Sequence, residues 1–116
     1  MNKKAFAGLC ATALFLAAGM ASADTYIRKG NQDISVVVTD GKLFCTRVSD
    51  GFEMCNGMLK QPDGTWKGGH MKHPDMPGFM RFNGTVTFTP TDKPTGLTIQ
   101  GCALGICQSE AWPKKS

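Results

Sequence analysis

The sequence predicts an all-β fold, a small antiparallel meander that closes into a barrel or half-barrel, with a two-sheet sandwich as the alternative. Two observations carry this prediction. Short runs rich in β-branched and aromatic residues alternate between apolar and polar, with the period of two that a half-buried strand shows. Asp-Gly, Asn-Gly and proline-containing turns separate these runs, and no window after residue 23 has an apolar period of 3.6 over a helical length.

The N-terminal segment is typical of a cleaved export signal. Lys3 and Lys4 form a short positive region, residues 5–18 are almost entirely apolar, and an Ala-Ser-Ala triplet supplies the small residues that a signal peptidase reads. The apolar run is shorter than the roughly 20 residues that a membrane-spanning helix needs. We therefore expect a signal peptide over residues 1–23, no transmembrane anchor, and one small domain over residues 24–116 in the periplasm or outside the cell.

The domain divides into runs with strand character, each ended by a turn. Asp40-Gly41 is the strongest hairpin signal, and Asp50-Gly51 and Pro62-Asp63-Gly64 end later runs. Asn56-Gly57 predicts a bulge or bend within one strand, and Asn83-Gly84 predicts a kink within another. The expected strands cover residues 34–39, 42–48, 52–59, 79–89, 97–101 and 107–112.

Four cysteines follow the predicted signal, and an even number in a small exported domain predicts two disulfides. We favour the pairs Cys45–Cys55 and Cys102–Cys107, because each pair flanks a turn signal. The two crossed pairings stay open at this point. A four-thiolate zinc site is disfavoured, because such sites use C-x-x-C spacings that these cysteines lack. Cys10 falls inside the signal and is expected to be removed with it.

Composition and motifs argue against two classes of function. The chain has a formal net charge of +4 at pH 7, but its basic residues are scattered, so we expect no nucleic-acid partner. There is no G-x-S-x-G motif, neither histidine has a serine or cysteine close in sequence, and the cysteines are expected to be oxidised. We therefore expect that the protein is not an enzyme.

Several short motifs resemble those of one family. The chain is similar to an uncharacterised family of small secreted bacterial domains, a domain of unknown function whose members share a W-x-G-G-x-[IM]-x-x-P core, a G-C-x-L-G turn and a closing tryptophan. The resemblance implies a lipocalin-like β-barrel or half-barrel and a structural role for the matching residues, and it implies no activity. The matching positions are Trp66, Gly68, Gly69, Met71, Pro74, Gly101, Cys102, Gly105 and Trp112.

This chain also departs from the family pattern. It lacks the tryptophan often found near the mature N-terminus, and its segment between Cys55 and Trp66 is short. Both departures predict little interior space for a ligand, because a reduced barrel is filled by its own side chains. The pair Gly68-Gly69 predicts a bulge or a close approach to the backbone, by the ring of Trp66 or Trp112 or by a ligand.

Residues 66–80 contain both histidines and three of the seven methionines. Imidazole and thioether ligands suit soft metals, so this stretch predicts a copper or zinc site made by His70, His73, Met76 and Met80. The alternative is that the methionines fill gaps in the core and the histidines face solvent.

The sequence favours an exported, non-catalytic domain that binds a partner or associates with the cell envelope. One alternative is a periplasmic copper or zinc binder that uses the loop over residues 70–80. A weaker one is a secreted inhibitor that uses the same loop as a wedge. The pattern does not choose between a small ligand, a metal and an envelope protein as the partner.

Overall fold

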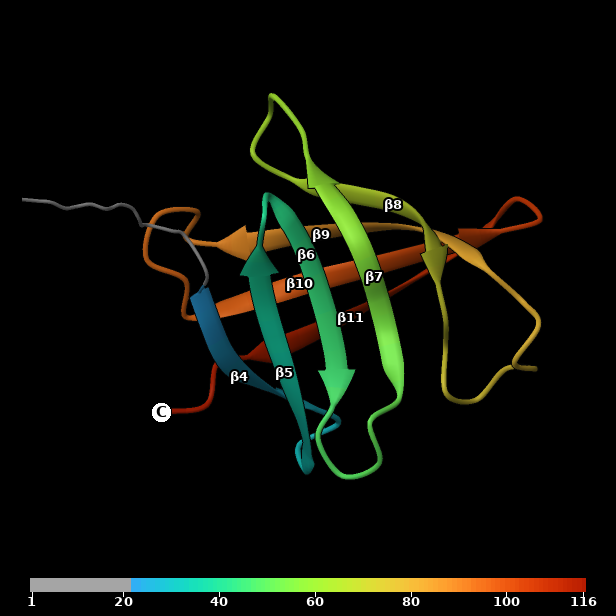
Figure 1. Ribbon diagram of the computed structural model, residues 1–116, viewed down its shortest axis with the longest axis horizontal. Helices are drawn as coiled ribbons and strands as arrows, with labels where there is room; N and C mark the ends of the chain where they lie inside the picture. Colours follow the sequence, from blue (N-terminus) through green and yellow to red (C-terminus); the bar gives the residue numbers. More distant parts are fainter. Residues whose placement is uncertain (1–21) are drawn as a thin grey trace, which may run out of the picture.

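The computed structural model describes residues 22–116, which form one sheet of eight antiparallel strands curled into a nearly closed barrel (Figure 1). The all-β prediction is confirmed. Within the described residues no helix is long and apolar enough to cross a membrane. The predicted signal peptide lies almost entirely outside the described residues. The strands are β4 (Ser22–Arg28), β5 (Gln32–Thr39), β6 (Lys42–Arg47), β7 (Glu53–Lys60), β8 (Trp66–Met71), β9 (Phe82–Thr89), β10 (Gly96–Ala103) and β11 (Ile106–Pro113).

Each strand pairs with the next one along the chain, and the two edge strands β4 and β11 then approach each other. Tyr26 and Lys114 form an isolated antiparallel bridge, and the backbone N–H of Lys115 donates to the carbonyl of Thr25 at 2.8 Å. This short seam closes the barrel, so an edge that would otherwise be exposed is covered.

The turns and the bulge follow the sequence signals. Asp40 and Gly41 both have positive φ values, 52° and 73°, as a two-residue hairpin turn requires. Gly57 has a φ of 75°, and the β6–β7 register shifts opposite it, between Leu43 and Phe44. The predicted hairpin and the predicted bulge are both confirmed.

Two expectations about the strands are wrong, and a third is confirmed only in part. Strands β4 and β8 have no counterpart among the expected strands. In β4 one of the two buried inward residues is Arg28, and a charged residue hides the apolar alternation. Residues 79–81 lie in the β8–β9 loop, where Phe79 is exposed. Strand β9 pairs with β10 in unbroken register through Asn83 and Gly84, whereas its pairing with β8 shifts register beside Asn83, where the kink was predicted.

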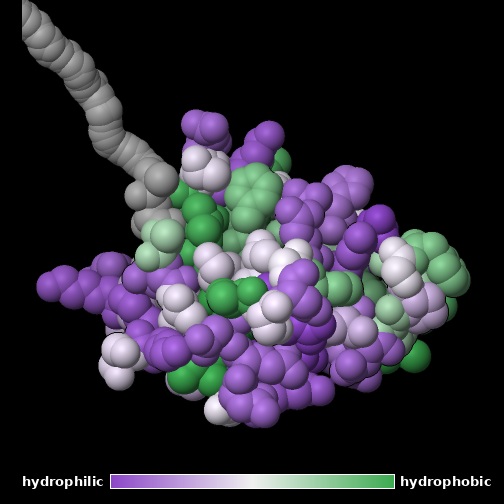
Figure 2. Space-filling model, turned by 60° about the horizontal axis from the view of Figure 1, so that its bottom comes forward, coloured by the Kyte–Doolittle hydropathy of each residue, from purple (hydrophilic) through white to green (hydrophobic). Residues whose placement is uncertain are grey.

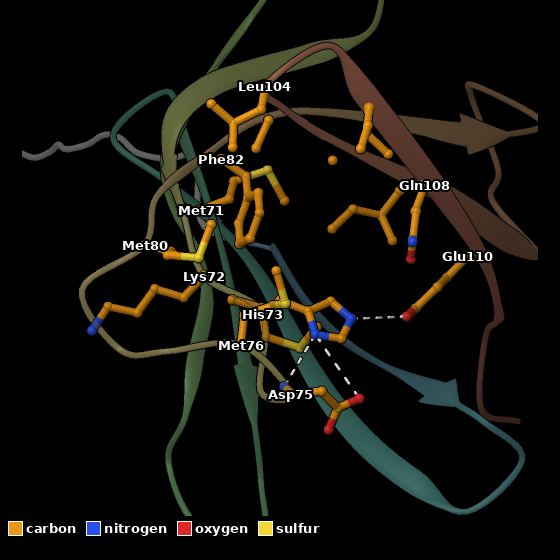
Figure 3. Close-up of a pocket in the computed structure, with 15 residues that line it drawn as sticks. Met71, Lys72, His73, Asp75, Met76, Met80, Phe82, Leu104, Gln108 and Glu110 are labelled. Atoms are coloured by element: carbon orange, nitrogen blue, oxygen red, sulfur yellow. Dashed lines mark hydrogen bonds and ion pairs between the residues drawn. The ribbon is translucent and has the colours of Figure 1, made fainter.

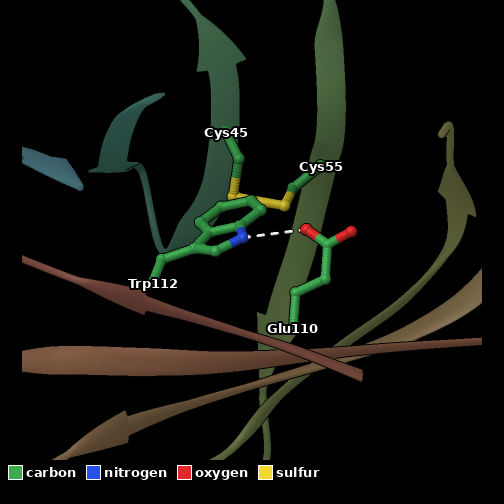
Figure 4. Close-up of a disulfide and its surroundings, with 4 residues drawn as sticks. All are labelled: Cys45, Cys55, Glu110 and Trp112. Carbon is green, nitrogen blue, oxygen red and sulfur yellow. Dashed lines mark hydrogen bonds between the residues drawn. A yellow bond between two sulfur atoms is a disulfide. The ribbon is translucent and has the colours of Figure 1, made fainter. Parts of the chain in front are cut away.

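The two predicted disulfides are confirmed, and they lie on opposite surfaces of the sheet. Cys45 and Cys55 are directly opposite on β6 and β7 and are fully buried, with Trp112 and Glu110 in their surroundings (Figure 4). Cys102 and Cys107 are opposite on β10 and β11, on the outward face of that hairpin.

The barrel has two unlike ends. The termini and the β5–β6, β7–β8 and β9–β10 turns lie at the first, which we call the packed end, and the four remaining turns lie at the second, the mouth. The packed end is filled by large side chains; Tyr26 and Phe88, for example, place their ring centroids 6.0 Å apart. Other buried residues of this core are Ile34, Val36, Leu43, Met58, Trp66, Val86, Leu97 and Trp112.

Candidate functional site

A cavity of about 460 Å³ occupies the mouth end of the barrel (Figure 3). Its position follows from the alternation of β10 and β11, whose inward residues line it while the residues between them face outward. The β8–β9 loop supplies the opposite wall. The lining residues are Met54, Met71, Lys72, His73, Asp75, Met76, Met80, Phe82, Ile99, Gly101, Ala103, Leu104, Ile106, Gln108 and Glu110.

Small inward residues make this space. Gly101 and Ala103 occupy inward positions on β10 where the packed end has Leu97. The space in front of Gly84 is not open, because a Cβ added there would overlap the sulfur of Met71. The prediction that this chain has little interior space is therefore wrong at the mouth, where two small residues leave a volume within the range of about 300–1,000 Å³ typical of ligand pockets.

Met71 reaches this position because strand β8 is irregular. The β8–β9 register shifts between Gly68 and Met71, which is the bulge that the glycine pair predicts. The side chain that approaches Gly68 belongs to Met58, whose Cγ would lie 3.1 Å from an added Cβ, so a methionine takes the place of the expected aromatic ring. Trp66 is buried at the start of the same strand.

A polar cluster lies beside the cavity, around Arg28 at the end of β4, which is only 1% exposed. Its Nε donates to Glu110 Oε1 at 2.7 Å and its Nη2 to Glu110 Oε2 at 3.0 Å, which is a bidentate ion pair. Nη1 donates to Gln32 Oε1 at 3.0 Å. Trp112 Nε1 also donates to Glu110 Oε1 at 3.0 Å, so the buried charge is both paired and hydrogen-bonded.

His73 connects this cluster to the β8–β9 loop. Its Nδ1 accepts a hydrogen bond from the backbone N–H of Asp75 at 3.1 Å, which places the proton of the neutral ring on Nε2. Nε2 then faces Glu110 Oε2 at 3.5 Å. Asp75 also forms an ion pair with Lys29 at 3.4 Å, which ties the loop to the β4–β5 turn. The loop that covers the cavity is therefore held from two sides.

These contacts set the protonation state of Glu110. Burial alone would raise its pKa, but hydrogen bonds from Arg28, Trp112 and His73, with the charge of Arg28, lower the pKa to about 2. Glu110 is therefore ionised at neutral pH and its oxygens already have donors. The cluster is a charged, internally satisfied group at one side of an otherwise largely apolar cavity.

The structure brings together three of the four predicted metal ligands. His73, Met76 and Met80 line the cavity, together with Met54 and Met71, which the prediction did not include as ligands. His70 does not line it and is exposed on β8. Within residues 22–116 no group of three or more histidine, cysteine, aspartate or glutamate side chains is arranged to hold a metal ion.

The structural motif residues divide between the two ends. Trp66 and Trp112 are buried in the core of the barrel, and Gly101 lines the cavity. Gly105 has a φ of 78° at the tip of the β10–β11 hairpin, and Pro74 is in the β8–β9 loop beside His73.

Sequence reasoning missed Arg28 and Glu110. For Glu110 a signal was present, since it alternates with Trp112 on the inward face of the closing strand, which is an unusual position for a carboxylate. For Arg28 no such signal exists in the sequence, because its strand was not expected.

Comparison of the chain with family models, with curated proteins and with solved structures finds no match. The resemblance to a family of secreted domains therefore stays a prediction.

Proposed function

We propose that the protein is an exported, non-catalytic binding module whose cavity takes a small, largely apolar molecule. The observation that carries this proposal is one cavity, at the mouth of the barrel, that combines a largely apolar lining with the polar cluster at one side. Such pockets typically bind a ligand through apolar contact and orient it with a few polar groups. Here Glu110, His73 and Gln108 are among the polar residues that line the space. Two disulfides are typical of oxidising compartments, which supports export.

The methionines favour a ligand of variable shape. Met54, Met71, Met76 and Met80 are unbranched and polarisable, so they adapt to an irregular apolar surface. The donors and acceptors of the polar cluster are already paired with one another. A ligand with a strongly charged head would therefore gain little binding energy from them. An uncharged or weakly polar molecule is the expected occupant.

Titration with N-phenyl-1-naphthylamine, a small apolar fluorophore, tests this proposal. We expect saturable fluorescence enhancement at one site per chain. Gln108 faces the cavity from β11, so Gln108→Trp would fill the space and weaken probe binding at least tenfold. Gln100→Trp is the matched control, because Gln100 is exposed on β10 and outside the cavity. Equal probe binding by both variants, or no saturable binding by the unmodified protein, would rule the proposal out.

Copper(I) binding is the second candidate, and the convergence of His73, Met76 and Met80 on one cavity is the observation that favours it. Thioethers select copper(I). His73 would have to exchange its contact with Glu110 for the metal. A copper(I) titration against a competing chelator tests this, with His73→Ala in a Met76→Leu/Met80→Leu background expected to abolish binding. His70→Ala is the matched control, and binding that depends on His70 instead would contradict the assignment.

A further inference from the structure

Two loop tips at the mouth carry exposed apolar side chains. We call Met76, Phe79, Leu104 and Ile106 the apolar rim; they are 43%, 84%, 93% and 67% exposed. The first two belong to the β8–β9 loop and the other two to the β10–β11 hairpin. Both segments reach the right-hand side of the molecule in Figure 1, and Figure 2 shows hydrophobic surface gathered at that end. Three of these residues, Met76, Leu104 and Ile106, border the same cavity, and exposed apolar patches on loop tips mark candidate interaction sites.

Leu104 is unfavourable in this position for two independent reasons. It has a φ of 54° and Gly105 a φ of 78°, so the hairpin tip is a turn that favours asparagine, aspartate or glycine at both positions. A branched apolar residue in the left-handed region is strained. Its side chain is also almost entirely in water. A leucine at this tip is therefore costly to the isolated protein, and contact with an apolar partner would offset part of that cost.

The charges around the rim are mostly positive. The hairpin tip over residues 103–108 has no charged residue, and the loop over residues 72–81 has one carboxylate, Asp75, which is paired with Lys29. Among the described residues no carboxylate lies within ion-pair distance of Lys72 or Arg81. Arg81 donates to the carbonyl of Gly78, which keeps its guanidinium within the same loop as Phe79. Two unpaired cations thus accompany the apolar rim.

We propose that the apolar rim docks the mouth of the barrel on a lipid bilayer whose surface carries anionic headgroups. Four side chains on two loop tips are a small surface compared with the roughly 800 Å² that each partner buries in a stable protein complex. Insertion into the boundary between headgroups and acyl chains needs no complementary partner face. Phe79 and Leu104 enter that boundary, while Lys72 and Arg81 stay at the level of the headgroups and attract the anionic surface.

This docking places the cavity opening against the bilayer. Met76, Leu104 and Ile106 belong both to the rim and to the cavity lining. An apolar ligand would then move between membrane and cavity without crossing water. The docking itself does not depend on the proposed ligand binding, because Phe79 does not line the cavity.

Co-sedimentation with large unilamellar vesicles tests the proposal. The purified, oxidised protein is mixed with vesicles of phosphatidylethanolamine and phosphatidylglycerol or with vesicles of phosphatidylcholine alone. We expect binding to the anionic vesicles, a loss of at least tenfold for Phe79→Asp, and a comparable loss for Lys72→Gln/Arg81→Gln. Leu59→Asp is the matched control, because Leu59 is 53% exposed near the end of β7, away from the mouth, and this variant should bind like the unmodified protein.

Several results would overturn the docking proposal. These are the absence of binding to either vesicle, equal binding by the Phe79→Asp protein, and equal binding to phosphatidylcholine. Sedimentation velocity without lipid supplies one more: a dimer that Phe79→Asp abolishes would assign the rim to a second copy of the chain. Near-ultraviolet circular dichroism from the buried Trp66 and Trp112 checks that each variant is folded. Phe79→Asp should also leave binding of the naphthylamine probe unchanged, so docking and ligand binding are separable.

Discussion

The packed end and the mouth are built from the same strands but are filled in opposite ways. Along β10 the inward residues fall in size from Leu97 and Ile99 at the packed end to Gly101 and Ala103 at the mouth. Their neighbours follow the same trend, since Trp112 pairs with Leu97, whereas Gly101 lies opposite Gly84. Strand β10 pairs in unbroken register with both of its neighbours. Along this strand, residue size at inward positions therefore decides where the barrel has a core and where it has a cavity.

The polar cluster ties the two edge strands of the barrel together. Arg28, Glu110 and Trp112 join the first and last strands where the backbone seam is short. Removing either charged partner would leave the other as a buried, unpaired charge. The contrast between the ends can be tested by weakening each in turn.

Truncation at the packed end is expected to have the largest effect. Trp112→Ala removes a fully buried ring and a hydrogen bond to Glu110, so it should lower the free energy of unfolding by about 4 kcal/mol. Phe82→Ala at the mouth removes a partly buried ring beside an existing cavity and should cost about half as much. Urea unfolding followed by circular dichroism measures both values.

A conservative variant separates packing from hydrogen bonding. Trp112→Phe keeps most of the apolar volume and should cost only about 1–2 kcal/mol, largely through the lost donor to Glu110. Equal losses for Trp112→Ala and Phe82→Ala would contradict the division into a packed end and a mouth.

Local features of the fold and the cavity also differed in how well the sequence predicted them. The alternation of Leu97 and Ile99, the turn at Asp40-Gly41 and both disulfides follow from local patterns, because period and turn chemistry are encoded within a few residues. The cavity is different. It depends on which small residues from separate strands meet, and on the register shift that moves Met71 in front of Gly84. Those are consequences of long-range pairing.

The candidate site illustrates the same limit. The clustering of His73, Met76 and Met80 in sequence correctly indicated that they lie together, since they share one loop. Their polar partners were not predictable, because Arg28 and Glu110 are 82 residues apart and meet only when the barrel closes. His70 lies on β8, before the loop, where its side chain is exposed and does not line the cavity.

The two disulfides differ in burial, and they should therefore differ in how easily they are reduced. Cys45 and Cys55 are fully buried, whereas Cys107 is exposed on the outward face of the mouth hairpin. A mild reductant should therefore open Cys102–Cys107 first and leave Cys45–Cys55 intact, as alkylation and mass spectrometry would reveal. Because Cys102 and Cys107 close a short loop, the Cys102→Ser/Cys107→Ser protein should lose about 2 kcal/mol of unfolding free energy.

The buried pair supplies the comparison. The sequence separation is 10 for Cys45–Cys55 and 5 for Cys102–Cys107, so the buried bond constrains the unfolded chain slightly more, and its removal also leaves a gap in the core. Cys45→Ala/Cys55→Ala should therefore cost more, about 3 kcal/mol or above. Reduction of both bonds at the same rate would show that the inner face is more open than its burial indicates.

The smallest expected effect is the pH dependence of the polar cluster. The folded pKa of Glu110 is about 2, below its ordinary value of 4.5, so the folded state binds this proton more weakly than the unfolded state. The contribution is therefore complete above about pH 5 and is lost as the pH falls towards 2. Because the carboxylate is 29% exposed, solvent screening reduces the contribution to about 1–2 kcal/mol.

The difference in unfolding free energy between the unmodified and Glu110→Gln proteins isolates this contribution. The hydrogen bond from Arg47 and that from the Phe52 backbone also lower the pKa of Asp50 to about 2, but that carboxyl is present in both proteins and cancels. The difference should narrow by about 1–2 kcal/mol between pH 6 and pH 2, as urea unfolding at each pH would measure. Glu53→Gln, which replaces an exposed carboxyl on β7, is the matched control. If the difference in unfolding free energy for Glu110→Gln stays constant or widens in acid, the ion pair with Arg28 does not stabilise the fold.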